Sequence, residues 1–340
     1  MKPGPLALTL GDPAGIGPEI IVKAWNALRR DGPSFLVVGD FQALASASAS
    51  GAAILKKVIA PAEALDAFEH ALPVLDLPLR SPVIAGQPSS AAASSIIQWI
   101  ETAVGLALSG AVAGVVTAPI AKAPLYDAGF KFPGHTEFLG ELTAAASFDG
   151  ARGPVMMLTA GGLRVALVTV HAPLAKVSSL LSVGAIVNAS LVTAQALRRD
   201  FGILQPRLAV AGLNPHAGEG GGIGREEIEI VAPAVRALED LGINVTGPHP
   251  ADTLFPEGMR DRYDAAICLY HDQALIPVKM LDFWGGVNVT LGLPIVRTSP
   301  DHGTAFDIAG RGLARADSLI AAIRLTDQLA RARTGQERSA

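Results

Sequence analysis

The feature that most constrains the fold is a regular alternation of short apolar strands with longer helical segments. Several candidate strands are rich in β-branched residues and apolar on both faces, as expected when helices cover each side of a sheet. The candidate strands are 6–10, 34–39, 114–118, 155–160, 164–170, 207–213 and 264–270. The candidate helices are 17–30, 89–110, 135–146, 182–202, 225–242 and 318–332. This alternation predicts an α/β fold with a largely parallel sheet.

Composition narrows the class of protein. The chain has 340 residues, of which 50% are hydrophobic and 17% charged, enough for one large or two medium α/β domains. No run of Lys and Arg suggests a nucleic-acid or membrane surface, so we expect neither partner. The single cysteine, Cys268, excludes an internal disulfide framework and fits a reducing compartment. Gly and Pro interrupt the N-terminus too early for a signal peptide, so we expect a cytoplasmic protein.

Three histidines follow predicted strands. His171 comes directly after 164–170, His271 comes directly after 264–270, and His216 follows 207–213 after Asn-Pro. Ligands of open α/β sheets bind beyond the carboxyl ends of the strands, where three imidazoles could converge. One such histidine is more often a hydrogen-bonded structural residue, and the repetition is what favours a site. An open set of three histidines suits a divalent ion such as Zn²⁺, Co²⁺ or Mn²⁺.

Two glycine-rich stretches join strands to helices. GDPAGIGPE (11–19) and GEGGGIGREE (218–227) allow close approach of a ligand to the backbone, and a helix start favours an anion. Neither has the spacing of a dinucleotide fingerprint, and neither is followed by the Lys-Ser/Thr of a P-loop. This counts against a phosphotransferase that uses these loops.

Other polar residues stand where substrate could bind. His135 and Thr136 begin a helix, and Thr136 could be merely its cap. The region 277–299 is largely apolar and contains Lys279, Asn288 and Arg297; a charge in such a run needs a partner, either an anionic substrate or an internal ion pair. The carboxylate of Asp252 could hydrogen-bond a metal ligand or a substrate amine.

These motifs together resemble one family over nearly the full length of the chain. They are GDPAGIGPE, TAPIAK (117–122), FPGHTEFL (132–139), VTVHAPL (168–174), LNPHAGEGG (213–221), ADTLF (251–255), YHDQALIPVK (270–279), GVNVTLGLP (286–294) and RTSPDHGTAFDIAG (297–310). The family is that of 4-hydroxythreonine-4-phosphate dehydrogenase, from pyridoxine biosynthesis. GDPAGIGPE and HGTAFDIAG are also similar to segments of isocitrate and isopropylmalate dehydrogenases.

The resemblance implies a fold and a domain division. The expected fold is the two-domain α/β fold of those dehydrogenases, with the active site in the interdomain cleft. We expect residues 1–128 plus 285–340 to form the dinucleotide-associated domain. Residues 129–284 would then form the metal- and dimer-forming domain.

The resemblance also implies roles for residues. His171, His216 and His271 match the family's metal ligands, shared across the interface of a homodimer. Its substrate-binding positions match His135, Thr136, Lys279, Asn288 and Arg297. Its dinucleotide contacts correspond to the loop that contains His302, Gly303, Thr304, Asp307 and Gly310. The general base stays open among His135, Lys122, Asp252 and a metal-bound hydroxide.

The implied activity depends on a divalent metal (Zn²⁺, Mg²⁺ or Co²⁺) and on NAD or NADP. It oxidises 4-hydroxythreonine 4-phosphate at C3 and decarboxylates the product to 3-amino-2-oxopropyl phosphate. The nearest alternative is a related dehydrogenase of 4-phospho-threonate, 4-phospho-erythronate or an aromatic cis-dihydrodiol; the His135-Thr136 pair and the Lys279, Asn288 and Arg297 set favour a phosphorylated substrate. A non-catalytic, metal-stapled binding protein would need a fourth protein ligand, and Cys268 is out of step with His271 in its strand.

Overall fold

The computed structural model describes residues 4–48, 53–132 and 134–337. The chain divides into two compact units. Unit 1 comprises Met1–Ser147 and Pro294–Arg331, and unit 2 comprises Phe148–Leu293 and Ala332–Ala340. The domain ranges expected from the sequence stay a prediction.

Unit 1 is built on a parallel sheet with the strand order β3-β4-β2-β1-β5-β12. The strands are β1 (Leu6–Thr9), β2 (Phe35–Gly39), β3 (Leu55–Val58), β4 (Leu72–Asp76), β5 (Val115–Thr117) and β12 (Arg297–Pro300). The central strands β1, β2 and β5 are buried along their whole length, because helices cover both faces of a parallel sheet.

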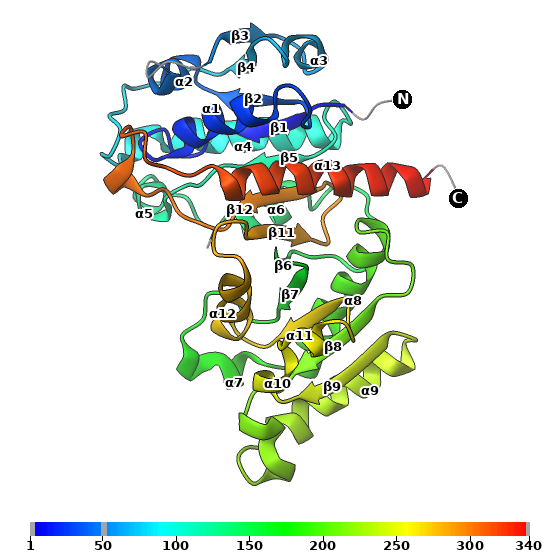
Figure 1. The fold of residues 1–340 in the computed structure, drawn as a ribbon. Helices are drawn as coiled ribbons and strands as arrows, with labels where there is room; N and C mark the ends of the chain where they lie inside the picture. Colours follow the sequence, from blue (N-terminus) through cyan, green and yellow to red (C-terminus); the bar gives the residue numbers. More distant parts are fainter. Residues whose placement is uncertain (1–3, 49–52, 133, 338–340) are drawn as a thin grey trace. The chain divides into compact units, whose positions relative to one another are not determined.

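The helices of unit 1 connect these strands (Figure 1). They are α1 (Gly17–Leu28), α2 (Phe41–Ser48), α3 (Glu63–Ala67), α4 (Ala93–Leu108), α5 (Lys122–Asp127), α6 (His135–Leu142) and most of α13 (Asp317–Glu337). Two buried tryptophans pack in this core, and the indole N–H of each has a hydrogen-bond acceptor. Trp25 Nε1 donates to the Phe68 carbonyl at 2.8 Å, and Trp99 Nε1 donates to the Leu77 carbonyl at 2.9 Å.

Helix α4 is the most apolar helix of unit 1. Within the part of the chain that the structure describes, Ser90–Leu108 is the one unbent helical stretch long and apolar enough to cross a membrane. Its residues Ile96, Trp99 and Ile100 are buried, and α4 packs against β1 and β2. Packing on the sheet therefore accounts for its apolar character.

Unit 2 has a mixed sheet with the order β11-β6-β7-β10-β8-β9. The strands are β6 (Val155–Ala160), β7 (Leu163–Leu167), β8 (Arg207–Ala211), β9 (Asn244–His249), β10 (Ala265–Cys268) and β11 (Val287–Leu291). Strand β6 runs antiparallel to both β7 and β11, whereas β7, β10, β8 and β9 are parallel. The predicted α/β fold with a mostly parallel sheet is confirmed.

The helices of unit 2 follow the parallel strands. They are α7 (Val177–Leu180), α8 (Val183–Arg199), α9 (Ala232–Asp240), α10 (Ala251–Leu254), α11 (Glu257–Arg260) and α12 (His271–Leu281). Ser182 caps α8 by accepting a hydrogen bond from the Ala185 amide at 3.1 Å. Cys268 lies in a buried cluster with Leu167, Ala211 and Val278, and burial raises the pKa of its thiol well above the usual range. It is therefore an inert core residue.

Candidate functional site

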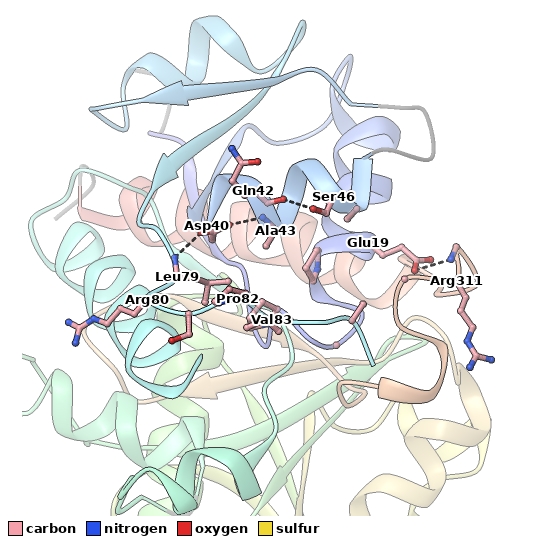
Figure 2. A pocket seen from close by; sticks show the side chains of 18 residues that line it. Glu19, Asp40, Gln42, Ala43, Ser46, Leu79, Arg80, Pro82, Val83 and Arg311 are labelled. Carbon is pink, nitrogen blue, oxygen red and sulfur yellow. Dashed lines mark hydrogen bonds between the residues drawn. The ribbon is translucent and has the colours of Figure 1, made fainter. Parts of the chain in front are cut away.

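Unit 1 contains a pocket of about 780 Å³ at the carboxyl ends of its parallel strands (Figure 2). Its lining comes from the loop between β1 and α1, from the residues that follow β2 and β4, and from Gly310 to Gly312. Ligands of open α/β sheets bind at this edge. Arg80 and Arg311 lie on opposite sides of the pocket in Figure 2, and both are exposed.

Two carboxylates in the pocket lining are occupied by internal hydrogen bonds. Asp40 accepts from the backbone amides of Ala43 at 2.6 Å and Leu79 at 2.8 Å. Glu19 accepts from Lys23 Nζ at 2.7 Å and from the amides of Gly312 and Ala314 at 3.2 and 2.9 Å. These carboxylates hold the walls together, which leaves the two arginines as the groups suited to an anionic ligand.

The five residues predicted to contact a dinucleotide lie in the loop between β12 and α13. Gly310 lines the pocket. Thr304 joins this loop to the glycine-rich motif 11–19, because the Thr304 carbonyl accepts a hydrogen bond from the Ile16 amide at 2.9 Å. His302, Gly303 and Asp307 are outside the pocket lining, and the ring Nδ1 of His302 lies 3.0 Å from the Gly303 carbonyl. Motifs far apart in the sequence thus form one wall.

A second cluster in unit 1 brings His135, Lys122 and Arg297 together. Burial, and then the positive charges of Arg297 and Lys122, hold the pKa of His135 well below its usual value of 6.5. Gly134 allows Lys122 to approach: a Cβ on this glycine would lie 3.3 Å from Lys122 Cε. His135 is therefore neutral at pH 7 and can accept a proton or a hydrogen bond.

Buried positive charge distinguishes this cluster. Arg297 is 2% exposed and donates to Thr117 Oγ1 at 2.5 Å. Burial lowers the pKa of its guanidinium to about 9. Nε2 of His135 is also buried, and it has no hydrogen-bond partner among residues 4–48, 53–132 and 134–337. Thr136 follows His135 in α6 and is partly buried. A cation that costs free energy to bury is typical of a site built for an anion.

In unit 2 the three histidines follow three neighbouring parallel strands. His171 follows β7, His271 begins α12 after β10, and His216 lies in the loop after β8. The ring centroids of His171 and His271 are 6.0 Å apart. Nδ1 of His271 lies 2.7 Å from Asp272 Oδ1, a contact that orients the ring.

His216 occupies a strained loop. It has φ 53°, and four residues after it, Ala217 to Gly220, also have positive φ. Among the described residues, one chain does not gather three His, Cys, Asp or Glu side chains into a metal group. A histidine held in the left-handed region costs free energy and is a common mark of a functional position.

A buried carboxylate fixes the start of this loop. Glu227 is 3% exposed, and its Oε1 accepts from the amides of Leu213 and Asn214, both at 2.7 Å. Its Oε2 accepts from Asn214 Nδ2 at 2.9 Å. The glycines of this loop were predicted to be functional, whereas this glutamate was not. Its signal was a carboxylate within the motif GREE that opens the next helix.

The other predicted residues of unit 2 are spread over three elements. Asp252 is exposed in α10, whereas Lys279 is partly buried in α12 with its Nζ 5.4 Å from the centroid of the Phe283 ring. Asn288 lies in β11, and its Oδ1 is buried with no hydrogen-bond partner in the described part of the chain. An unsatisfied buried amide oxygen fits a position that awaits a ligand donor.

The donor set of unit 2 fits a divalent ion in part. Two imidazoles near each other at the carboxyl edge of a sheet are ligands that suit Zn²⁺ or Co²⁺. The carboxylate of Asp272 beside one ring is the usual support of such a ligand.

Comparison with known proteins supplies the family. A sequence model described as "Pyridoxal phosphate biosynthetic protein PdxA" matches residues 32–326. The chain is 69% identical over 330 residues to 4-hydroxythreonine-4-phosphate dehydrogenase of Caulobacter vibrioides, covering 97% of this chain and 98% of that one.

Solved structures agree. The crystal structure of 4-hydroxythreonine-4-phosphate dehydrogenase from Klebsiella pneumoniae is 43% identical, with a TM-score of 0.85 and 96% and 98% of the two chains covered. A terephthalate 1,2-cis-dihydrodiol dehydrogenase from Burkholderia xenovorans is 30% identical, with a TM-score of 0.64 and the same coverage. The family predicted from the motifs is confirmed: the chain belongs to the pyridoxal phosphate biosynthetic protein PdxA family.

Proposed function

We propose that the chain is a 4-hydroxythreonine-4-phosphate dehydrogenase of pyridoxal phosphate biosynthesis. It oxidises C3 of its substrate with NAD or NADP, and decarboxylation then gives 3-amino-2-oxopropyl phosphate. The observation that carries this proposal is the buried Arg297 beside Lys122 and a neutral His135, a cluster suited to a phosphate or carboxylate. The activity of the relatives at high identity supports it.

The residues divide the chemistry between them. Arg297, Lys122 and Thr136 bind and orient the anionic end of the substrate, and Lys279 and Asn288 supply further polar contacts. His135, kept unprotonated by its surroundings, is the favoured acceptor of the hydroxyl proton, with Lys122 and Asp252 as the other candidates. The C3 hydroxyl loses its proton to this base, and the C3–H bond breaks as its hydride passes to the nicotinamide. The resulting β-keto acid then loses CO₂ and takes up a proton at the carbon that carried the carboxylate.

A divalent ion belongs to this proposal. His171, His216 and His271 would hold Zn²⁺, Mg²⁺ or Co²⁺, which when bound makes the substrate hydroxyl more acidic. Asp272 keeps His271 oriented for this task.

The pocket of unit 1 is the proposed site of NAD or NADP. Its place beyond the carboxyl ends of β1, β2 and β4 suits a dinucleotide, and Gly310 belongs to the loop predicted to contact it. Arg80 and Arg311 offer positive charge to the phosphates of the ligand. His302, Gly303, Thr304 and Asp307 shape the same loop.

We also propose a cytoplasmic homodimer with a metal site shared between the protomers. An apolar patch on unit 2 supports the dimer: Ile276, Met280, Phe283 and Trp284 are all more than half exposed. Adjacent exposed apolar side chains of this size are typical of an interaction surface. We assign the third ligand of the site to a second copy, because the described residues of one chain do not form a group of three ligands.

A related substrate is the second candidate. The similarity to a terephthalate cis-dihydrodiol dehydrogenase keeps open an aromatic diol, and 4-phospho-threonate or 4-phospho-erythronate would use the same anion-binding groups. The buried cationic cluster of unit 1 favours a phosphorylated substrate over an aromatic one.

A substrate panel tests the proposal. Enzyme stripped of metal and then reconstituted with Zn²⁺, Mg²⁺ or Co²⁺ is given each candidate substrate with NAD or NADP, and reduced cofactor is measured by absorbance. We expect metal-dependent turnover of 4-hydroxythreonine 4-phosphate, a loss of at least 100-fold on His171→Ala, and no loss on His70→Ala, which changes an exposed histidine. Faster turnover of another substrate, or full activity without metal, would refute it.

A further inference from the structure

Buried polar side chains tie together the strand ends that precede the three histidines of unit 2. Strands β7, β10 and β8 are neighbours, with β10 in the middle. Thr169, which follows β7, bonds to the backbone that follows β10. Gln273, in the helix that follows β10, bonds to the backbone that follows β8.

Gln273 makes two of these hydrogen bonds. It lies in the first turn of α12, two residues after His271, and is 6% exposed. Its Oε1 accepts from the Leu269 amide at 2.7 Å, and its Nε2 donates to the Gly212 carbonyl at 2.7 Å. Gly212 begins the loop that leads to His216. One amide therefore connects the backbone before His271 with the backbone before His216.

Only a side chain that both accepts and donates can make this connection. The Leu269 amide needs an acceptor and the Gly212 carbonyl needs a donor, which fixes the orientation of the glutamine amide. Because the group is buried, losing either bond would leave a backbone polar group unsatisfied.

Thr169 extends the network to the third histidine. Its Oγ1 donates to the Leu269 carbonyl at 2.7 Å, so Leu269 is held from both sides. Thr169 lies two residues before His171 and is also buried. The resulting chain of bonds runs from the His171 loop through Leu269 and Gln273 to the His216 loop.

We propose that Gln273 is a positioning residue for divalent-metal binding: it fixes the His271 loop relative to the His216 loop before the ion arrives. This rests on the proposed metal-dependent function. The described residues of one chain do not form a group of three metal ligands. A site completed by a second copy therefore requires each chain to hold its histidines in fixed positions relative to one another.

The test is a Co²⁺ titration of the metal-stripped full-length protein, followed by visible absorbance and calorimetry. Gln273→Met keeps the volume and removes both hydrogen bonds, and we expect the Kd for Co²⁺ to rise about tenfold. At saturating Co²⁺ we expect kcat to recover to within about threefold of the native value, because the ligands themselves are intact. Thr193→Val, which removes a buried hydroxyl bond to Ala189 within α8 of the same unit, is the control and should leave the Kd unchanged.

A second variant guards against a folding defect. Thr169→Val is nearly isosteric and removes the side-chain hydrogen bond to the Leu269 carbonyl, while the Thr169 backbone amide still donates to that carbonyl at 3.3 Å. We expect it to raise the Kd about threefold. In the double variant the two effects should be non-additive, since both act through Leu269. Additive effects, or a Gln273→Met Kd for Co²⁺ within twofold of the native value, would overturn the role of Gln273 and leave the proposed function standing. If the native protein binds no Co²⁺ that depends on His271, the proposed function fails as well.

Discussion

Burial sets the protonation state of the basic groups in unit 1. Arg297 stays cationic with a pKa lowered to about 9, whereas burial and two neighbouring cations keep His135 neutral. Burial lowers the pKa of both groups. The ordinary pKa of arginine is so high that the guanidinium still keeps its proton at pH 7, whereas the ordinary pKa of histidine already lies below 7. A fixed cation beside a neutral imidazole gives one cluster both an anion-binding group and a proton acceptor.

The lowered pKa of His135 makes stability depend on pH. The unfolded chain takes up a proton as pH falls through 6.5, whereas folded His135 does not until a lower pH, so folding free energy is lost in that window. We expect His135→Asn to reduce this loss by up to about 1 kcal/mol per pH unit. Urea unfolding between pH 5 and pH 8 measures it.

The control for this prediction is His70→Asn, at an exposed histidine of the same unit. It should keep the native pH dependence. Identical slopes for the native protein and His135→Asn would show that His135 is free to protonate in the folded state.

The sequence motifs predicted which residues take part in the site better than they predicted the pKa values and hydrogen-bond partners of those residues. His135 and Arg297 were identified by motif, but the lowered pKa of each arises mainly from burial, to which the charges of Arg297 and Lys122 add at His135. Glu227 was missed because its backbone partners lie 13 and 14 residues earlier in the chain, and Gln273 because one of its partners is a carbonyl in the loop after another strand. A pattern along the chain does not reveal such partners.

At the scale of elements, strands that rely on distant partners escaped prediction. Strand β12, with the sequence RTSP, is fully buried although three of its residues are polar. Thr298 Oγ1 donates to the Ala322 carbonyl in α13 at 2.9 Å, which satisfies a group that looks exposed in the sequence. Strand β3 has two exposed lysines, as is common at a sheet edge, and β9 contains Gly-Pro. Most apolar strands with buried neighbours were predicted from their own composition, although β4 and β11 were not.

The loop after β8 gives an element-scale prediction. In Glu227→Gln, one carboxylate oxygen becomes an NH₂ group. In one orientation of the amide this NH₂ faces the donor Nδ2 of Asn214, and in the other it faces the two backbone amides that Oε1 accepted from. We expect the free energy of unfolding to fall by about 2 kcal/mol. Hydrogen exchange at the amides of Leu213 and Asn214 should accelerate. Both are measured by denaturant unfolding and by exchange mass spectrometry or NMR.

Glu229→Gln is the matched control, two residues along the same segment. Its carboxylate is exposed and pairs with Arg225, so we expect a change below about 0.5 kcal/mol. Equal effects of the two substitutions would mean that the buried hydrogen bonds do not hold the loop.

At the scale of the whole molecule, each unit contributes a different chemistry. Unit 1 has the pocket and the cationic cluster, and unit 2 has the histidines and the apolar patch. The α/β class followed from strand and helix periodicity. Assembly did not, because the patch residues Met280 and Trp284 look in sequence like ordinary core positions at helical spacing. The structure distinguishes them by their exposure.

The dimer proposal yields the last prediction. Met280 is 82% exposed at the centre of the run Ile276, Met280, Phe283 and Trp284, so Met280→Glu places a charge in the proposed interface. An uncompensated buried carboxylate costs about 3 kcal/mol, which should weaken dimerisation by about 100-fold and produce monomer at micromolar concentration. Co²⁺ affinity should fall with it if the histidines of two protomers share the ion. Sedimentation velocity and Co²⁺ titration measure the two effects.

Ile59→Glu, at a residue that is 90% exposed in unit 1, should leave both unchanged. A Met280→Glu protein that sediments as a dimer would rule out this patch as the interface, and a monomer with native Co²⁺ affinity would rule out a shared site.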